Sequence, residues 1–230
     1  MRGSATSTSP VPADTRSFRF LSAIEFMLGA AIVIGHNVLR VVPNEVLILA
    51  LAGLVSVRWR DGGWSAMGFR RPSSWRRVAL IAVAAAGLRI GLDEALIGPL
   101  VERFWPSTEA PEELAGIAGN LPALLQWLGV VWVFAAFGEE TAYRGYLLTR
   151  AADIGRRTRM AYWVAVVLVA ALFGIGHYWN GPSGMISSGF AGLVLGAAYM
   201  LSGRNLWASI LAHGLIDTIY LIAIYFGWNS

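Results

Sequence analysis

The chain has 230 residues, of which 56% are hydrophobic and only 14% are charged, and its formal net charge is +4. A mean hydropathy of +0.57 excludes an ordinary soluble domain and indicates an integral membrane protein. The chain contains neither Cys nor Lys, which excludes disulfides, Cys-ligated metals, thiolate catalysis, a Ser/Lys dyad and Schiff-base chemistry.

The predicted elements are apolar runs, each close to the roughly 20 residues that a helix needs to cross a hydrocarbon core. They lie at 20–39, 42–57, 78–96, 121–137, 160–177, 185–201 and 206–226. Because the runs are continuous and do not alternate, they favour helices over barrel strands. We therefore predict an all-α fold, a polytopic transmembrane bundle with about seven spans. Pro43 and Glu45 shorten the second run, which is expected to be tilted or partly re-entrant.

Residues 1–19 are rich in Ser, Thr, Pro and Ala, which is typical of a disordered tail. The first run ends at His36 and Asn37 without a small-residue cleavage pattern, so we interpret it as an uncleaved anchor. The sequence thus predicts a disordered cytoplasmic tail at 1–19 and one transmembrane domain at 20–230.

The Arg residues predict the orientation. If the N-terminus is inside, Arg40 and Arg103 fall outside, Arg89 falls within a span, and every other Arg falls on the inner side. The positive-inside rule therefore predicts N-in. The basic charge then reflects topology and anionic lipid headgroups, and no nucleic-acid module is visible. The Lys-free composition, rich in Ala, Gly and Arg, is typical of a GC-rich prokaryote, so we expect a prokaryotic plasma membrane.

Two carboxylates and an Arg follow the fourth run, in Glu139-Glu140-x-x-x-Arg144. Glu140 and Arg144 share a helix face and can pair, whereas Glu139 points about 100° away. Charged groups within lipid are costly and are functional by default. We therefore expect these three residues to belong to an active site.

Two histidines in later runs begin or end motifs with the same spacing. Phe173 shares a face with His177, and His213 shares a face with Asp217, which can fix the tautomer of that imidazole. Small residues that let neighbouring helices approach closely lie in these runs, at Gly174, Gly176, Gly192, Gly196 and Gly214.

Together, EExxxR, FxxxH and HxxxD in this order resemble the CAAX protease and bacteriocin-processing family of intramembrane endopeptidases. The resemblance has its motif core at 127–223 and includes the Gly-Tyr-Leu-Leu stretch at 145–148. It implies hydrolysis of a peptide bond within the membrane. The eukaryotic prenyl-protein endopeptidases carry Asn where this chain has Asp217, so their substrate does not follow from the resemblance.

The roles implied by this resemblance are specific. Glu139 is expected to act as general base on a water that His177 and His213 hold directly or through a divalent metal. Glu140, fixed by Arg144, is expected to support the site.

Two alternatives stay open for the water. Glu139, His177 and His213 are a ligand set of the kind that binds Zn²⁺, and the same groups can also act without a metal. Asp217 is expected to orient His213 or to stabilise the developing oxyanion.

The expected partners are membrane lipid and a protein or peptide substrate that can be prenylated, while the sequence does not predict an oligomeric state. We expect a polar cavity among the fourth, fifth and seventh spans that opens toward the Arg-rich, cytoplasmic side. Other functions stay open: a rhomboid-like protease with Ser183 as nucleophile and His213 as base, a proton-coupled transporter, or a non-catalytic or bacteriocin-immunity-type membrane protein. Arg89 and Asp93 are interpreted as a self-neutralising pair.

Helix rise gives a test of depth. Glu139 lies about 16 Å from Arg150, whereas His177 lies about 27 Å from Arg159 on a straight helix. We therefore predict that residues 151–163 lie along the cytoplasmic interface and that the fifth span starts later. A straight helix from Arg159 with His177 far from Glu139 would contradict the catalytic interpretation.

Overall fold

The computed structural model of the chain describes residues 15–106 and 112–228, and these ranges contain helices and no strand. This confirms the predicted all-α fold class. The α-helices are α1 (Arg16–Asn37), α2 (Glu45–Arg60), α3 (Trp75–Leu92), α4 (Gly98–Phe104), α5 (Leu121–Val130), α6 (Leu148–Ile154), α7 (Arg159–Ile175), α8 (Gly181–Leu201) and α9 (Leu206–Tyr225). The 3₁₀-helices are η1 (Trp64–Met67), η3 (Glu112–Ile117) and η6 (Tyr178–Asn180), and the π-helices are η2 (Asp93–Ile97), η4 (Val131–Glu139) and η5 (Thr141–Leu147).

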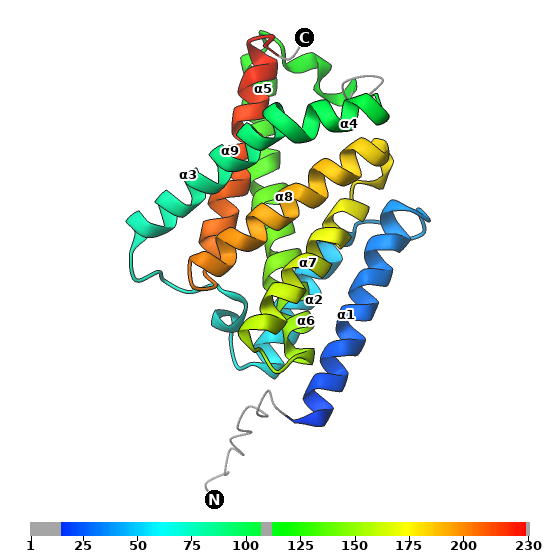
Figure 1. Cartoon of the computed structure of the whole chain (residues 1–230), viewed down its shortest axis with the longest axis vertical. Helices are drawn as coiled ribbons and strands as arrows, with labels where there is room; N and C mark the ends of the chain where they lie inside the picture. The colour runs from blue at the N-terminus through cyan, green and yellow to red at the C-terminus, as the bar shows by residue number, and fades with distance from the viewer. Residues whose placement is uncertain (1–14, 107–111, 229–230) are drawn as a thin grey trace, which may run out of the picture.

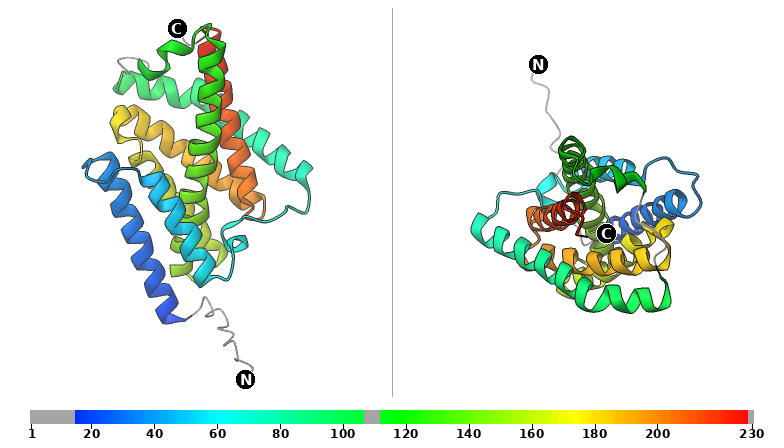
Figure 2. Two further views of the ribbon diagram at one scale, coloured as in Figure 1. Left: turned by 180° about the vertical axis from the view of Figure 1, so that it is seen from behind. Right: turned by 90° about the horizontal axis from the view of Figure 1, so that it is seen from above.

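A single long rod organises the bundle. The helices α5, η4, η5 and α6 join into one 34-residue helix, Leu121–Ile154, that runs along the length of the molecule (Figures 1 and 2). The helices α1 and α2 pack against η5 and α6, while α9 packs against η4 and also contacts α3 and α8. The rod thus lies between two groups of helices, and the motif Glu139-Glu140-x-x-x-Arg144 lies within its middle part.

Four helices are long and apolar enough to cross a membrane: Arg16–Asn37, Leu121–Ile154, Tyr178–Leu201 and Leu206–Tyr225. Arg159–Ile175 is apolar but shorter. The predicted runs at 42–57 and 78–96 fall in α2, which has only 16 residues, and α3, which carries three Arg. Of the seven predicted spans, the described residues therefore provide four by length and composition.

The helix of the fourth run continues past its apolar part. The apolar part ends at residue 137, and the helix runs on through the Glu-Glu motif to Ile154, as the helix distance counted from Arg150 assumes, with its later charges buried in ion pairs. Arg150 Nη1 lies 2.9 Å from Asp153 Oδ2 and its Nη2 lies 2.9 Å from Asp61 Oδ2. The predicted interfacial segment 151–163 is therefore wrong: α6 ends the rod, and α7 begins at Arg159.

The N-terminal boundary also differs. Residues 1–14 of the predicted tail lie outside the described residues, but α1 already begins at Arg16. The Thr15 side chain accepts a hydrogen bond from the Phe18 amide, and Phe18 is buried. The Arg19 side chain donates to the carbonyl of Ile154 at 2.9 Å. Residues 16–19 thus belong to the helical bundle and not to a disordered tail.

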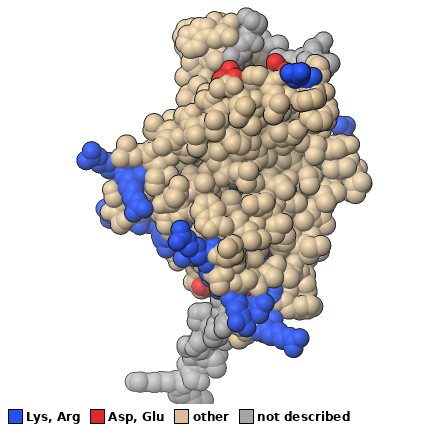
Figure 3. Space-filling model, viewed as in Figure 1, with Lys and Arg blue, Asp and Glu red and all other residues tan. Residues whose placement is uncertain are grey.

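Charged side chains are unevenly distributed. Figure 3 shows Arg side chains along one flank and around the end where the N-terminus lies, and acidic side chains at the opposite end. A buried ion-pair cluster closes the Arg-rich end and joins α1, α2 and α6 to the turn before α7; its members are Glu25, Arg60, Asp61, Arg150, Asp153 and Arg157.

Glycines let α7 and α8 pack closely, as the sequence predicted. A Cβ atom at Gly174 would lie 2.6 Å from the Met185 carbonyl oxygen, and one at Gly192 would lie 2.9 Å from Ala170 Cα. Because both neighbours are backbone atoms, larger residues at these positions would push the helices apart.

Candidate active site

The second carboxylate of the motif is held inside the protein. Glu140 lies between η4 and η5, and its Oε1 lies 2.8 Å from Arg144 Nη1. Both side chains are almost completely buried, with exposed fractions of 0% and 1%. The predicted pairing of Glu140 with Arg144 is thus confirmed.

Helix α9 adds an imidazole to this pair. His213 Nδ1 lies 2.9 Å from Glu140 Oε1, and His213 Nε2 lies 3.5 Å from Asp217 Oδ2. The predicted contact between His213 and Asp217 is confirmed, while the contact with Glu140 brings in a residue from the rod. Four of the six predicted site residues therefore form one buried cluster, which we call the buried charge cluster: Glu140, Arg144, His213 and Asp217.

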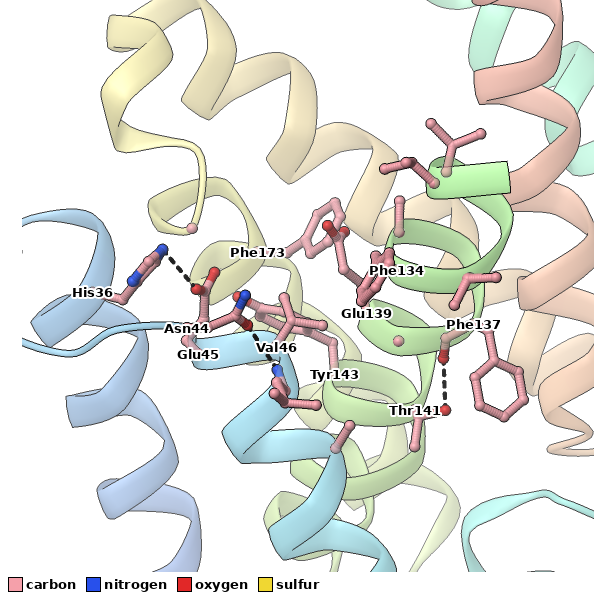
Figure 4. A pocket seen from close by; sticks show the side chains of 18 of the residues that line it. His36, Asn44, Glu45, Val46, Phe134, Phe137, Glu139, Thr141, Tyr143 and Phe173 are labelled. Atoms are coloured by element: carbon pink, nitrogen blue, oxygen red, sulfur yellow. Dashed lines mark hydrogen bonds and ion pairs between the residues drawn. The ribbon is translucent and has the colours of Figure 1, made fainter. Parts of the chain in front are cut away.

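The other two residues, Glu139 and His177, line a cavity of about 580 Å³, here called the first cavity. Figure 4 shows Glu139 beside Phe173 and Tyr143, which also line it. The neighbour of Glu139 in the chain, Glu140, belongs to the buried charge cluster. Glu139 thus lies between the first cavity and the buried charge cluster.

His177 lies in the turn that follows α7. Its Nδ1 lies 2.9 Å from the Phe173 carbonyl oxygen, which can only accept a hydrogen bond. Nδ1 therefore carries the hydrogen, and Nε2 of the neutral ring keeps its lone pair. Such a nitrogen is suited to hold or deprotonate a water molecule.

The depth conflict predicted for His177 is resolved without an interfacial segment. Although α7 begins at Arg159, His177 and Glu139 line the same cavity. Arg150 is fully buried and does not mark the membrane surface, since the rod continues to Ile154. Counted from Ile154, Glu139 lies about 22 Å along the helix, much nearer to the depth of His177.

Phe173 holds the two parts of the site together. Its ring centroid lies 4.9 Å from that of His177 and 6.1 Å from that of His213. It also makes an edge contact with Tyr143 at 5.1 Å, and the Arg144 guanidinium lies 4.3 Å from its centroid. Phe173 therefore separates Arg144 from the first cavity while contacting both histidines.

Sequence reasoning missed a polar group on the opposite wall. Glu45 accepts a hydrogen bond from Asn37 Nδ2 at 3.0 Å and lies 3.0 Å from His36 Nε2, and all three residues line the first cavity. They belong to the end of α1 and the start of α2, where they match no motif. The signal available was Glu45 itself, a carboxylate that interrupts an apolar run.

The opening of the first cavity differs from the prediction. His36 and Asn44 line it beside the α1–α2 connection, which carries Arg40, whereas Arg16 and Arg60 lie at the other ends of these helices. The cavity therefore does not open toward the Arg-rich end. The prediction placed Glu139 too near that end because it took the buried Arg150 as the membrane boundary.

The rim of the first cavity is apolar. Several lining side chains between α2 and η4 have more than half of their surface exposed on the outside of the bundle; these are Leu47, Leu51, Val133 and Phe134. In a membrane protein this surface faces lipid, so a chain within the bilayer can reach the cavity from the side.

The residues do not fit the predicted metal site. Among residues 15–106 and 112–228, no group of three or more His, Cys, Asp or Glu side chains is arranged to hold a metal ion. His213, one of the three expected ligands, directs one ring nitrogen to Glu140 and the other to Asp217. We therefore derive no catalytic step through a metal.

The rhomboid-like alternative finds no support in the geometry. Ser183 lies in the first turn of α8 and lines a second cavity, whereas His213 contacts Glu140 and Asp217. The self-neutralising pair predicted for Arg89 and Asp93 is present, with 2.9 Å between Arg89 Nη1 and Asp93 Oδ1.

Comparison with known proteins agrees with the motifs. Residues 121–219 match the family model described as type II CAAX prenyl endopeptidase Rce1-like. Neither the curated proteins nor the solved structures give a match. The matched segment contains the rod from its first residue, the FxxxH turn and the HxxxD face of α9. The matched segment covers 99 of the 230 residues, and over this segment the chain is similar to the Rce1-like type II CAAX prenyl endopeptidases.

Proposed function

We propose that the protein is an intramembrane endopeptidase of the CAAX prenyl protease type. It hydrolyses a peptide bond near the C-terminus of a membrane-associated protein or peptide that carries a lipid such as a prenyl chain. The observation that carries this proposal is the division of the site: Glu139 and His177 face the first cavity, and Glu140, Arg144 and His213 lie behind them.

Glu139 and His177, which line the first cavity, are the groups that the proposed hydrolysis uses. His177 Nε2 accepts a hydrogen bond from a water molecule and so orients it. Glu139 takes a proton from this water, and the water oxygen attacks the carbonyl carbon of the substrate. The carbon–nitrogen bond then breaks. The proton held by Glu139 passes to the leaving nitrogen, so that one water yields one carboxylate and one amine.

The buried charge cluster provides the electrostatic frame for this reaction. His213 lies between the carboxylates of Glu140 and Asp217, so each of its ring nitrogens faces one of them. The cluster also contains the guanidinium of Arg144, whose Nη1 lies 2.8 Å from Glu140 Oε1. A fixed positive group stabilises negative charge that develops in the transition state without reorganising.

The apolar rim supports a lipid-bearing substrate. Leu47, Leu51 and Phe134 are exposed where the first cavity meets the outer surface of the bundle. A lipid chain can remain among such side chains and in the bilayer while the attached peptide reaches Glu139, because the transfer of apolar surface between the two costs little.

The test is cleavage of a fluorogenic prenylated CAAX-type peptide by purified protein. We expect Glu139→Gln to lower kcat by about 10²–10⁴-fold, the contribution of a general base. Glu94→Gln is the matched control, because Glu94 is exposed and lines neither the first nor the second cavity. Full activity in Glu139→Gln would overturn the assigned role, and no cleavage by the wild type would count against the proposed substrate.

The same assay includes a strong chelator. Because the proposed steps use only side chains, the rate is expected to stay unchanged. A loss of activity that added Zn²⁺ restores would show that the residue-only mechanism is wrong.

A further inference from the structure

A second cavity lies next to the first and has no part in the proposed function so far. Its volume is about 860 Å³, and Trp179 lines both cavities. It lies among η2, α4, η6, the start of α8 and α9. Unlike the first cavity, its lining includes many polar side chains: Asp93, Glu102, Asn180, Ser183, Ser187 and Tyr220.

Helix α9 connects this cavity to the buried charge cluster. His213, Asp217 and Tyr220 are spaced by four and three residues, so they lie along one face of the helix. His213 contacts Glu140 at one end of this face, and Tyr220 lines the second cavity at the other. A line of polar groups therefore leads from the cavity to the candidate active site.

Two further helices contribute polar groups to the same place. Arg89 of α3 donates to Ser187 Oγ of α8 at 2.7 Å, and Ser187 donates to Asp93 Oδ1 at 3.1 Å. The helices α3, α8 and α9 pack against one another. We call this group the polar seam: Arg89, Asp93, Ser187, Asp217 and Tyr220.

Two observations indicate that water enters the polar seam. The Nε atom of Arg89 is buried and has no hydrogen-bond partner among the described residues, and such a group requires a partner such as water. The Asp217 side chain is 24% exposed, whereas Glu140 and Arg144 are at most 1% exposed. Asp217 lines neither the first nor the second cavity, but Tyr220, one turn further along α9, lines the second.

We propose that the polar seam is a water path, through which the second cavity supplies the hydrolytic water to the active site. Its role in catalysis rests on the proposed function, whereas the entry of water does not. Each turnover consumes one water, and a lipid-bearing substrate that fills the first cavity blocks its apolar rim. A separate polar route lets water reach Glu139 and His213 while the substrate is bound.

The absence of Cys from the chain allows a direct test. Ser187→Cys places a thiol in the polar seam, and Ser188→Cys is the matched control on the same helix, because Ser188 lines neither cavity. Both variants, in phosphatidylcholine liposomes, are treated with a negatively charged methanethiosulfonate, and mass spectrometry measures the modified fraction. We expect Ser187→Cys to react at least about tenfold faster, because the reactive thiolate is disfavoured in apolar surroundings.

The same modification tests the role in catalysis. Modified Ser187→Cys is expected to hydrolyse the prenylated peptide with kcat about tenfold or more below its value before treatment and with unchanged KM, because the first cavity stays open. Treatment of Ser188→Cys is expected to leave the rate as it was.

Equal labelling of the two variants would overturn the water path, whether or not the protein cleaves peptides. Labelling of Ser187→Cys without a change in kcat would overturn the supply of the hydrolytic water. A wild type without peptidase activity would contradict the proposed function, while the labelling would still decide the path. If Ser187→Cys does not fold, Ser183→Cys, which lies one turn earlier on α8 and also lines the second cavity, is tested with the same expectation.

Discussion

Adjacent carboxylates occupy different surroundings in this site. Glu139 lines the first cavity, whereas Glu140 is completely buried against Arg144 and His213. Helix periodicity predicted this division, because neighbouring residues point in different directions and only Glu140 has an Arg four residues later. The partner of Glu140 on α9 was not predictable, since no local rule sets which helices of a bundle meet.

Removal of the Arg from this pair is expected to destabilise the fold. Arg144→Gln leaves the buried carboxylate of Glu140 with His213 as its remaining charged partner, and breaking a buried pair in this way costs about 3–5 kcal/mol. The midpoint of thermal unfolding in one detergent measures the effect. Arg103→Gln changes an exposed Arg and is the control; equal midpoints for the two variants would contradict the structural role of Arg144.

The polar group formed by His36, Asn37 and Glu45 shows where sequence reasoning fails at the scale of residues. These side chains contact one another across the α1–α2 connection, and they face His177 across the first cavity. Single polar residues at helix ends are ordinary in sequences. Only the packing of α1 and α2 against the rod brings them to the site.

At the scale of elements, the rod is where prediction and structure differ most. The apolar run ends near residue 137, but α6 extends the helix to Ile154 because ion pairs compensate Arg150 and Asp153. A hydropathy value treats each charged residue as unfavourable in the membrane and does not include the effect of an ion-pair partner. The π-helical turns on either side of Glu140 leave no pattern in the sequence, since they depend on packing at both ends of the rod.

The close packing of α7 against α8 predicts a sensitive position. In Gly174→Ala the new methyl group would lie 2.6 Å from the Met185 carbonyl oxygen, so the two helices must separate. We expect a loss of about 1–3 kcal/mol in stability, as for an overpacked core, and a lower kcat because His177 follows three residues later.

Gly87→Ala on α3 is the matched control, because nothing lies within 4 Å of the added Cβ. This variant is expected to be more stable by about 0.5–1 kcal/mol, the usual gain of Ala over Gly inside a helix. Thermal unfolding of both variants in the same detergent gives the comparison. A Gly174→Ala protein as stable as Gly87→Ala would show that α7 and α8 tolerate a larger separation.

For the whole molecule, composition predicted the helical membrane class, and four of the predicted runs lie in helices that are long and apolar enough to cross a membrane. The counted runs included α2 and α3, whose lengths and Arg residues differ from those of the four longer apolar helices. Both helices nevertheless contact the rest of the bundle. Apolar runs indicate burial, and burial against neighbouring helices is not the same as a complete crossing.

The uneven Arg distribution gives a prediction about orientation. Following the positive-inside rule, the α1–α2 connection is expected outside and the α2–α3 connection inside. Val41→Cys should therefore react with an impermeant thiol reagent in intact cells, whereas Ser73→Cys should react only after the cells are broken. Detection by mass shift decides the outcome, and the reverse pattern would invert the orientation.

The apolar rim between α2 and η4 has a kinetic consequence. A substrate that enters from the side meets the protein by diffusion in the plane of the bilayer, so the concentration that governs encounter is the number of substrate molecules per unit area. Dilution of the membrane suspension with buffer then leaves the encounter rate unchanged, whereas added lipid lowers this rate because it lowers the number of substrate molecules per unit area. For the proposed peptidase, the rate of encounter therefore depends on how many substrate molecules share its membrane per unit area.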